Sequence, residues 1–147
     1  MKTIYATTAF DGIDSKRAGG RWNTLGRAVV YTSEHPATVT LEIRVHVKRA
    51  QLLREHYSVI EAEVPDALVR SLDLAALPAG WDAPEETAAS TSIGDAWFDQ
   101  RVSVALKVPS AVIRGQFNVL LNPLHTDWQQ VAIHQAEPFA FDPRLAS

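Results

Sequence analysis

The chain of 147 residues carries 14 basic and 17 acidic side chains, a formal net charge of -3, and no cysteine. The lack of cysteine excludes disulfides, a thiolate nucleophile and cysteine-based metal sites. The slightly acidic balance argues against a protein that wraps a nucleic-acid backbone, because that affinity comes from clustered cations. No run of apolar residues is long enough for a membrane span and the first residues do not resemble a signal peptide, so we expect a cytoplasmic protein with a single domain, residues 1–147.

The first half of the chain predicts a strand, a helix and a second strand. Residues 27–32 are rich in β-branched and aromatic side chains, which is typical of a buried strand. Ser33 is expected to cap the helix that follows, and that helix is predicted over 37–47 and carries Glu42. Residues 57–64 alternate in character and predict a second strand.

The second half of the chain predicts two helices followed by four strands. The helices are expected over 67–74 and 86–100. The strands are expected over 102–108, 117–121, 131–134 and 139–141. Because the strands gather at the end with few helices between them, we predict an α+β fold with mixed, largely antiparallel sheets.

The most unusual segment is Gly-Gly-Arg-Trp-Asn at residues 19–23. Its glycines, Gly19 and Gly20, permit a sharp turn whose successive N–H groups can hold an anion, and the planar guanidinium of Arg21 can grip a phosphate. The alternative is a plain turn with a surface arginine and a core tryptophan. The pattern alone slightly favours the plain turn, since neither a Walker motif nor a complete dinucleotide fingerprint is present.

Tyr31 and Glu42 are the next candidates. Tyr31 ends a predicted strand and Glu42 lies on the helix that follows, so the ring and the carboxylate can meet at the opening of one pocket. The alternative is a core tyrosine and a solvated helix glutamate, which is the commoner situation for glutamate. The apolar neighbours of Glu42, Leu41 and Ile43 among them, favour partial burial. A carboxylate that is partly buried near a cation becomes a functional candidate.

Ser110 follows a predicted strand and Asn118 lies in the next one. No histidine lies near Ser110 in the sequence, and no Gly-x-Ser-x-Gly elbow surrounds it, so we expect a ligand-binding hydroxyl or a turn serine instead of a nucleophile. The five histidines show no metal-ligand spacing, and no metal site is predicted.

A series of short segments, in this order and spacing, resembles the RES-domain family. The segments are Gly19-Gly20-Arg21-Trp22-Asn23, Val29-Val30-Tyr31-Thr32-Ser33, Leu41-Glu42, Leu77-Pro78-Ala79-Gly80-Trp81, Ile93-Gly94-Asp95-Ala96-Trp97, Val108-Pro109-Ser110-Ala111, Asn118-Val119-Leu120-Leu121-Asn122-Pro123 and Phe141-Asp142-Pro143-Arg144-Leu145. Each segment alone is a weak signal, but together they span the chain from residue 19 to its end. The arginine, glutamate and serine that give the family its name map onto Arg21, Glu42 and Ser110.

This resemblance implies the toxin half of a bacterial toxin–antitoxin pair, with an Xre-type helix-turn-helix antitoxin as partner and a homodimer within their complex. It also implies a fold similar to ADP-ribosyltransferase toxins and an enzyme that degrades NAD. The expected reaction is phosphorolysis of the nicotinamide–ribose bond. NAD is then a substrate, inorganic phosphate a co-substrate, and no cofactor is expected.

The resemblance also assigns roles to individual residues. Catalytic roles are expected for Arg21, Tyr31, Glu42 and Ser110. Substrate binding is expected from Gly20, Arg21, Asn23, Tyr31, Ser110 and Asn118. A carboxylate at Glu42 fits this chemistry, because breaking an N-glycosidic bond builds positive charge on the ribose, and the face of Tyr31 can cover a flat cationic ring.

The sequence departs from the family near its start, where many members have an arginine and this chain has Ala6. If that arginine clamps the substrate, Lys16 or Arg17 would have to replace it. Three alternatives therefore stay open: an ADP-ribosyltransferase that modifies a macromolecule, a non-catalytic module that binds NAD or the antitoxin, and a toxin directed at nucleic acid. The absence of a basic stripe disfavours the last of these and any direct nucleic-acid binding.

Overall fold

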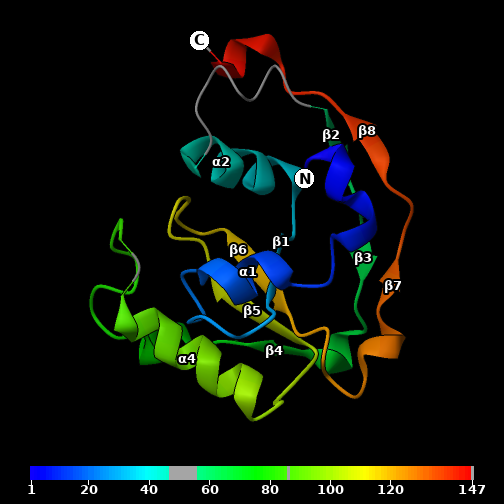
Figure 1. The fold of residues 1–147 in the computed structure, drawn as a ribbon. Helices are drawn as coiled ribbons and strands as arrows, with labels where there is room; N and C mark the ends of the chain where they lie inside the picture. Colours follow the sequence, from blue (N-terminus) through cyan, green and yellow to red (C-terminus); the bar gives the residue numbers. More distant parts are fainter. Residues whose placement is uncertain (47–55, 86, 147) are drawn as a thin grey trace.

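A four-stranded sheet forms the centre of the computed structural model, which describes residues 1–46, 56–85 and 87–146 (Figure 1). The strand order is β1-β6-β5-β4, with β1 at Val30–Ser33, β6 at Phe117–Leu121, β5 at Ala105–Pro109 and β4 at Val69–Ser71. The pairs β1–β6 and β6–β5 are antiparallel, whereas β5–β4 is parallel. The predicted α+β class with mixed, largely antiparallel sheets is confirmed.

A second, narrower ladder runs beside the central sheet (Figure 1). It consists of β2 (Tyr57–Val59) paired with β8 (Glu137–Phe139), and β3 (Ala62–Glu63) paired with β7 (Ala132–Ile133), both antiparallel. Between the two pairs, the His134 amide donates to the Glu61 carbonyl at 2.9 Å. The continuous strand predicted over 57–64 is therefore interrupted at residues 60–61.

Alternation along the central strands gives the sheet two apolar faces. Leu106, Val108 and Leu120 point to one face, where they pack with Trp22 and with Trp97 of α4 (Ala88–Asp99). The other face carries a separate buried group formed by Val30, Ala105 and Leu121, against which Phe10, Val64 and Trp128 pack. The sheet is thus covered on both sides, as side-chain alternation requires.

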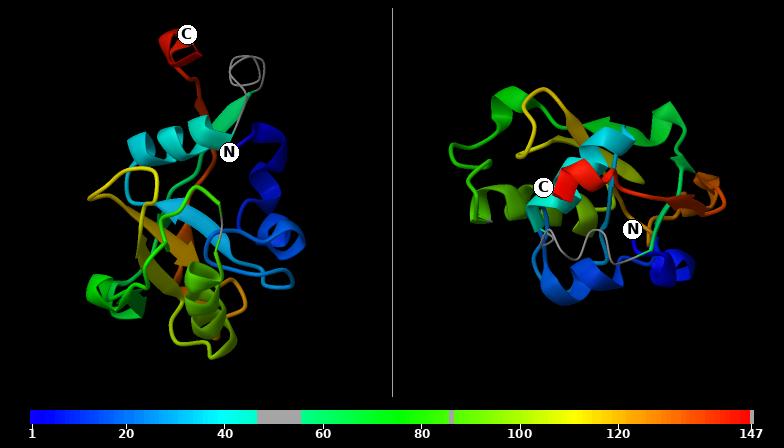
Figure 2. Two further views of the ribbon diagram at one scale, coloured as in Figure 1. Left: turned by 90° about the vertical axis from the view of Figure 1, so that its left-hand side faces the viewer. Right: turned by 90° about the horizontal axis from the view of Figure 1, so that it is seen from above.

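Helix α2 (Pro36–His46) follows β1 after a short turn and lies at the end of the central sheet (Figure 1). Figure 2 shows the loop 110–116, which joins β5 to β6, at the same end of the molecule. Helix α1 (Ile13–Ala18) precedes β1 and is joined to it by the buried hydroxyl of Ser15, which donates to the Val29 carbonyl at 2.6 Å and accepts from the Val29 amide at 2.8 Å. Short 3-10 helices occupy Thr3–Thr8, Asp66–Leu68, Leu74–Ala76, Trp128–Gln130 and Pro143–Ala146.

Several sequence expectations fail for identifiable reasons. The helix over 67–74 is wrong, because residues 69–71 pair with β5 as strand β4 and this tertiary pairing overrides the local preference. Ser33 does not cap α2; it is the last residue of β1, and the carbonyl of His35 accepts from the first helical amides. Helix α1 was not expected within its polar, glycine-containing segment.

Other expectations hold in outline. The predicted helices over 37–47 and 86–100 correspond to α2 and α4, although residues 47 and 86 lie outside the described part of the chain. Strand β6 has the predicted bounds, while β1, β5, β7 and β8 are shifted by a few residues or shortened. In the part of the chain that the structure describes, no helix is both long enough and apolar enough to cross a membrane.

Candidate functional site

Three of the predicted residues meet around the carboxylate of Glu42. The Ser110 hydroxyl donates to Glu42 Oε1 at 2.8 Å, and the Asn118 side-chain amide donates to the same oxygen at 2.8 Å. The three residues come from α2, from the residue after β5, and from β6. We call Glu42, Ser110 and Asn118 the carboxylate cluster. Glu42 Oε1 thereby accepts from two residues that lie 68 and 76 positions further along the chain.

The strand register explains why these side chains meet. Asn118 lies between Ser33 of β1 and Val108 of β5, so the end of β5 and the start of β6 both reach the place where β1 turns into α2. The Ser33 hydroxyl bonds to Asn118 Oδ1. With the oxygen of its amide facing Ser33, Asn118 must turn its NH2 group toward Glu42.

Ser110 is held equally firmly. Its hydroxyl oxygen accepts from the backbone amides of Val112 at 3.1 Å and Ile113 at 3.0 Å while its proton is directed at Glu42. The residue is buried. A hydroxyl with its proton and both lone pairs engaged positions a neighbour, so Ser110 has the geometry of a support for the Glu42 carboxylate and not that of an activated nucleophile.

The second group of predicted residues surrounds Tyr31. The Tyr31 hydroxyl donates to Asn23 Oδ1 at 2.7 Å and accepts from the Trp22 amide at 3.0 Å. Residues Gly20 and Asn23 close a turn with two reciprocal backbone hydrogen bonds, of 2.9 and 3.1 Å. Tyr31 as a whole residue nevertheless remains 40% exposed, so it offers a surface while its hydroxyl is anchored.

The turn does not form the anion-binding nest that its glycines suggested. The amides of Gly19, Gly20 and Asn23 donate to backbone carbonyls, and the Trp22 amide donates to Tyr31. A nest needs successive N–H groups that point at a ligand, and here these groups are used inside the protein. We therefore expect anion recognition by this segment to come from the Arg21 side chain.

Arg21 joins neither group by a hydrogen bond in the described part of the chain. Its Nη1 donates to the Trp81 carbonyl at 2.9 Å and its Nη2 to the Pro84 carbonyl at 3.4 Å. These bonds attach the glycine turn to the loop that precedes α4. A guanidinium has five N–H donors, so the two carbonyls leave capacity for an anion.

The two groups lie along one side of β1. Tyr31 and Ser33 are two residues apart in the strand, so their side chains project from the same face, about 7 Å apart along the chain. Tyr31 leads to the glycine turn and Ser33 leads to the carboxylate cluster. The Tyr31 ring thus lies at one end of this strand face, and at the other end Ser33 connects through Asn118 to the Glu42 carboxylate of α2.

The charge of Glu42 is met by neutral donors. Within the described residues, no ion pair involves Glu42 and no hydrogen bond reaches its second oxygen, Oε2. A carboxylate supported on one oxygen and open on the other can accept from a ribose hydroxyl or stabilise a nearby positive charge. Among the described residues, no group of three His, Asp or Glu side chains is arranged to hold a metal ion.

A cavity of about 1100 Å³ lies on the other side of β1. It is lined by Thr32, Val119 and Leu121 from the second face of the sheet, and by parts of α1, α2 and the β2–β3 segment. Tyr31 and Ser33 touch it, but the carboxylate cluster does not line it. We take the carboxylate cluster as the candidate chemical centre, because it joins three of the residues that the family resemblance assigns to the site.

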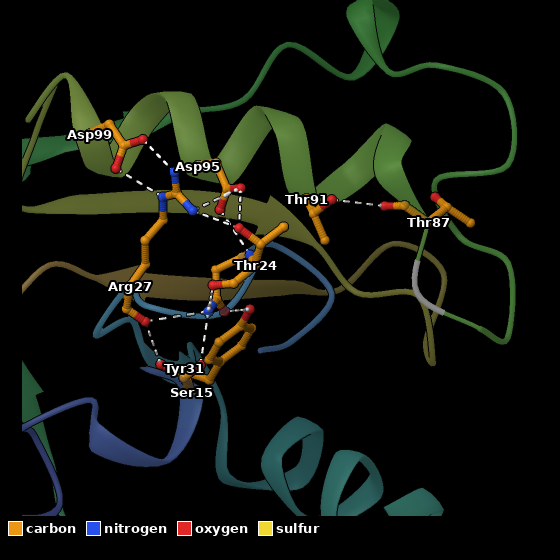
Figure 3. Close-up of polar contacts among 9 residues, drawn as sticks. Ser15, Thr24, Arg27, Tyr31, Thr87, Thr91, Asp95 and Asp99 are labelled. Atoms are coloured by element: carbon orange, nitrogen blue, oxygen red, sulfur yellow. Dashed lines mark hydrogen bonds and ion pairs between the residues drawn. The ribbon is translucent and has the colours of Figure 1, made fainter. Parts of the chain in front are cut away.

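Helix α4 holds the segment that follows the glycine turn through contacts with Thr24 and Arg27 (Figure 3). Asp95 accepts from the Thr24 amide at 2.9 Å and from its hydroxyl at 2.7 Å, and Arg27 pairs with Asp99 at 2.6 Å and with Asp95 at 3.2 Å. The hydrogen bond from Arg27 lowers the pKa of Asp99 and raises the pKa of Arg27. Gly94 packs so closely on the turn that a Cβ there would lie 1.8 Å from the Trp22 carbonyl oxygen.

Sequence reasoning missed the roles of Ser33, Gly94 and Asp95. The sequence predicts a helix cap at Ser33, although its position two residues after Tyr31, directly beyond the strand predicted over 27–32, would place it on the site face if that strand were one residue longer. Gly94 and Asp95 stand in a motif, Ile93-Gly94-Asp95-Ala96-Trp97, whose glycine within a predicted helix signals a close approach of another backbone. Lys16 and Arg17, the expected substitutes for the missing arginine, lie exposed on α1.

Comparisons with known proteins agree on one family. The family model described as the RES domain matches residues 2–142. A protein named Toxin Res from Photorhabdus laumondii is 33% identical over 145 residues, which cover 98% of this chain and 92% of the relative. A protein named Prs ADP-ribosylating toxin from Sphingobium sp. is 34% identical, with 96% and 89% covered.

The fold also resembles a solved structure. A chain in the crystal structure of the M. tuberculosis MbcT-MbcA toxin-antitoxin complex aligns with a TM-score of 0.67 at 20% sequence identity. The alignment covers 94% of this chain and 80% of that chain.

Proposed function

Because this chain belongs to the RES domain family, we propose that it is the toxin of a toxin–antitoxin pair and that it acts by cleaving the nicotinamide–ribose bond of NAD. The observation that carries the proposal is the Glu42 carboxylate of α2, which Ser110 and Asn118 hold on one oxygen and which connects through Asn118 and Ser33 to the strand face that carries Tyr31. A fixed anion beside an aromatic surface suits a cationic base attached to a sugar.

In this mechanism the bond between ribose C1″ and the nicotinamide nitrogen breaks, and its electron pair leaves with nicotinamide. Positive charge develops on the ribose, and Glu42 stabilises it through the oxygen that faces away from Ser110 and Asn118. An oxygen of inorganic phosphate then bonds to C1″, which yields ADP-ribose 1″-phosphate. Tyr31 covers the nicotinamide ring, and Arg21 uses its remaining donors on the anionic groups of the substrate.

The supporting residues contribute by orientation. Ser110 and Asn118 hold Glu42 in one rotamer, so that no reorganisation is needed when charge develops on the ribose. No cofactor takes part, since NAD is consumed and phosphate is the second substrate. The antitoxin partner is supported by the toxin-antitoxin complex whose toxin-like chain shares this fold; an Xre-type antitoxin, a homodimer and a cytoplasmic location belong to the same proposal.

The acceptor is tested by product analysis. Purified protein is incubated with NAD in phosphate or in a phosphate-free buffer, and the products are separated and identified by mass. We expect nicotinamide and ADP-ribose 1″-phosphate when phosphate is present and little turnover without it. Free ADP-ribose in both buffers would instead identify a hydrolase, and intact NAD in both would refute the proposal.

A second candidate function is favoured by one relative. The protein named Prs ADP-ribosylating toxin is 34% identical to this chain over 144 residues. The same site could then pass the ribose to a macromolecule, because the bond that breaks is the same and the acceptor alone differs. NAD labelled in the adenylate part separates the two: a transferase leaves label on a protein acceptor, whereas a phosphorylase leaves it in a small molecule.

A further inference from the structure

The side chain of Asn23 is buried and turned inward, so it has no surface to offer a substrate directly. It is 1% exposed, and its Nδ2 lies 3.1 Å from the Ser15 carbonyl, 3.0 Å from the Thr24 carbonyl and 3.4 Å from the Arg27 carbonyl. Because carbonyl oxygens only accept hydrogen bonds, the end of the Asn23 amide that faces these three carbonyls is its NH2 group. The oxygen Oδ1 must therefore face Tyr31.

The Tyr31 hydroxyl is consequently held at two points. Its proton goes to Asn23 Oδ1 at 2.7 Å, and its oxygen receives the Trp22 amide at 3.0 Å. A phenol held in this way has its ring fixed in plane and tilt. An aromatic ring that is fixed before the ligand arrives binds a flat partner without the entropy cost of being ordered.

Gly20 shapes the same contact by leaving space for the hydroxyl. A Cβ at Gly20 would lie 2.7 Å from Tyr31 Oη, 3.0 Å from Tyr31 Cζ and 3.2 Å from Asn23 Oδ1. Contacts under 3.0 Å force one partner to move. The glycine is needed because the hydroxyl and the amide meet directly beside its Cα.

We propose that Asn23 is a positioning residue that, with Gly20, sets the orientation of the Tyr31 ring and thereby the affinity for the nicotinamide end of NAD. The inference rests on the proposed function and makes it more specific. Asn23 acts through Tyr31 and not by touching the dinucleotide. The Asn23–Tyr31 pair therefore governs binding of the base, while Glu42 governs the bond-breaking step.

The test compares Asn23→Ala and Tyr31→Phe, which remove opposite ends of one hydrogen bond, in the NAD-consumption assay. Tyr31→Phe keeps the ring and loses only its anchor. We expect the KM for NAD to rise about three- to tenfold in each variant, with kcat within about twofold of wild type, from the typical strength of an aromatic contact. The KM for NAD of the double variant should be no higher than that of the more affected single variant, since both substitutions act on the orientation of the Tyr31 ring.

A ligand without the base separates positioning from general damage. ADP-ribose lacks nicotinamide, so its inhibition constant should stay within about twofold of wild type in both variants. Asn122→Ala is a matched control, because Asn122 is also 1% exposed but lies at the end of β6 with its Oδ1 bonded to the Leu124 amide. Asn122→Ala should lower stability without changing the ratio of the KM for NAD to the inhibition constant of ADP-ribose.

Gly20→Ala is a second route to the same result if Asn23→Ala does not fold. It should raise the KM for NAD in the wild-type background and have a smaller effect in the Tyr31→Phe background, where the hydroxyl that clashes is gone. An unchanged KM for NAD in Asn23→Ala and Tyr31→Phe would overturn the inference. Equal rises in the KM for NAD and in the inhibition constant of ADP-ribose would also overturn it. A wild-type protein that leaves NAD intact would instead refute the proposed function, which keeps the two failures distinct.

Discussion

Replacing Glu42 with glutamine removes its charge while keeping its shape. The side-chain oxygen of glutamine can still accept from the Ser110 hydroxyl and the Asn118 amide, which both bond to Oε1 at 2.8 Å in the wild type. The amide group then takes the place of the open oxygen. Glu42→Gln therefore changes the electrostatics of the carboxylate cluster with little change in its geometry.

The expected loss of rate follows from Coulomb's law. A carboxylate about 4 Å from the charge that develops on the ribose contributes about 4 kcal/mol at an effective dielectric constant of about 20. Because each 1.36 kcal/mol corresponds to a factor of ten in rate, kcat should fall about 10³-fold. The KM for NAD should change much less, since the ground-state ring is covered by Tyr31.

The stability of Glu42→Gln should change little by comparison. Hydrogen bonds to a charged group contribute about 1 kcal/mol more than neutral ones, which corresponds to a decrease in Tm of a few degrees for a chain of this size. Rates of nicotinamide release and thermal melting are measured on the same preparation. Glu63→Gln is the matched control, because Glu63 is an exposed carboxylate on β3 that pairs with His134. A folded Glu42→Gln protein within tenfold of the wild-type kcat would refute the reasoning.

Three further outcomes are expected. Ser110→Ala removes one charge-assisted hydrogen bond from the carboxylate and should lower kcat about tenfold, as measured by nicotinamide release. Gly94→Ala places a methyl group 1.8 Å from the Trp22 carbonyl oxygen and should cost 1 to 3 kcal/mol or more, about the range for overpacking, with a lower Tm in calorimetry. Asp99→Asn should lower Tm near neutral pH, and the difference from wild type should shrink as the pH falls below about 4, because the Arg27 hydrogen bond lowers the folded-state pKa of Asp99.

The sign of the Asp99 effect follows from the direction of the pKa shift. A carboxyl group with a lower pKa in the folded state adds stability above its unfolded pKa, and this stability is lost as the pH falls through the folded value. The gain stays within about 1 kcal/mol because the Asp99 side chain is 53% exposed. A wild-type protein that gains stability relative to Asp99→Asn on acidification would contradict the assignment.

The Gly94→Ala substitution has a control on the same helix. Ser92→Ala lies on α4, as Gly94 does, and its side chain is exposed and bonded to the Ala89 carbonyl of its own helix. It should leave Tm within about one degree of wild type, since surface helix substitutions of this kind have small effects. A large decrease in Tm for Ser92→Ala would show that α4 tolerates no change and would remove the argument from Gly94.

Much of the fold was accessible from local sequence patterns. Helix α2 with Glu42 and strand β6 with Asn118 follow from periodicity and from their bounding prolines, because these segments pack as their patterns require. The structure of segment 67–74 does not follow from its local pattern, because Val69 belongs to strand β4, which pairs in parallel with β5, a strand far along the chain. Pairing across such a distance leaves no local trace.

The candidate site was predictable as a set of residues but not as a geometry. The resemblance to a family selected Arg21, Tyr31, Glu42 and Ser110, yet it could not say which of them touch. The strand register brings Ser110 to the Glu42 carboxylate, whereas Arg21 donates to the backbone carbonyl of Trp81. The burial of Asn23 was equally inaccessible, because an asparagine after Gly-Gly-Arg-Trp is typical of an exposed turn.

Nicotinamide release at varied phosphate tests the central claim most directly. The purified wild-type protein is held at a fixed NAD concentration while phosphate is raised from zero, and nicotinamide and NAD are both quantified. We expect one nicotinamide for each NAD lost, at a rate that rises with phosphate to saturation and falls about 10³-fold in Glu42→Gln. Folded wild-type protein that releases no nicotinamide at any phosphate concentration would contradict it.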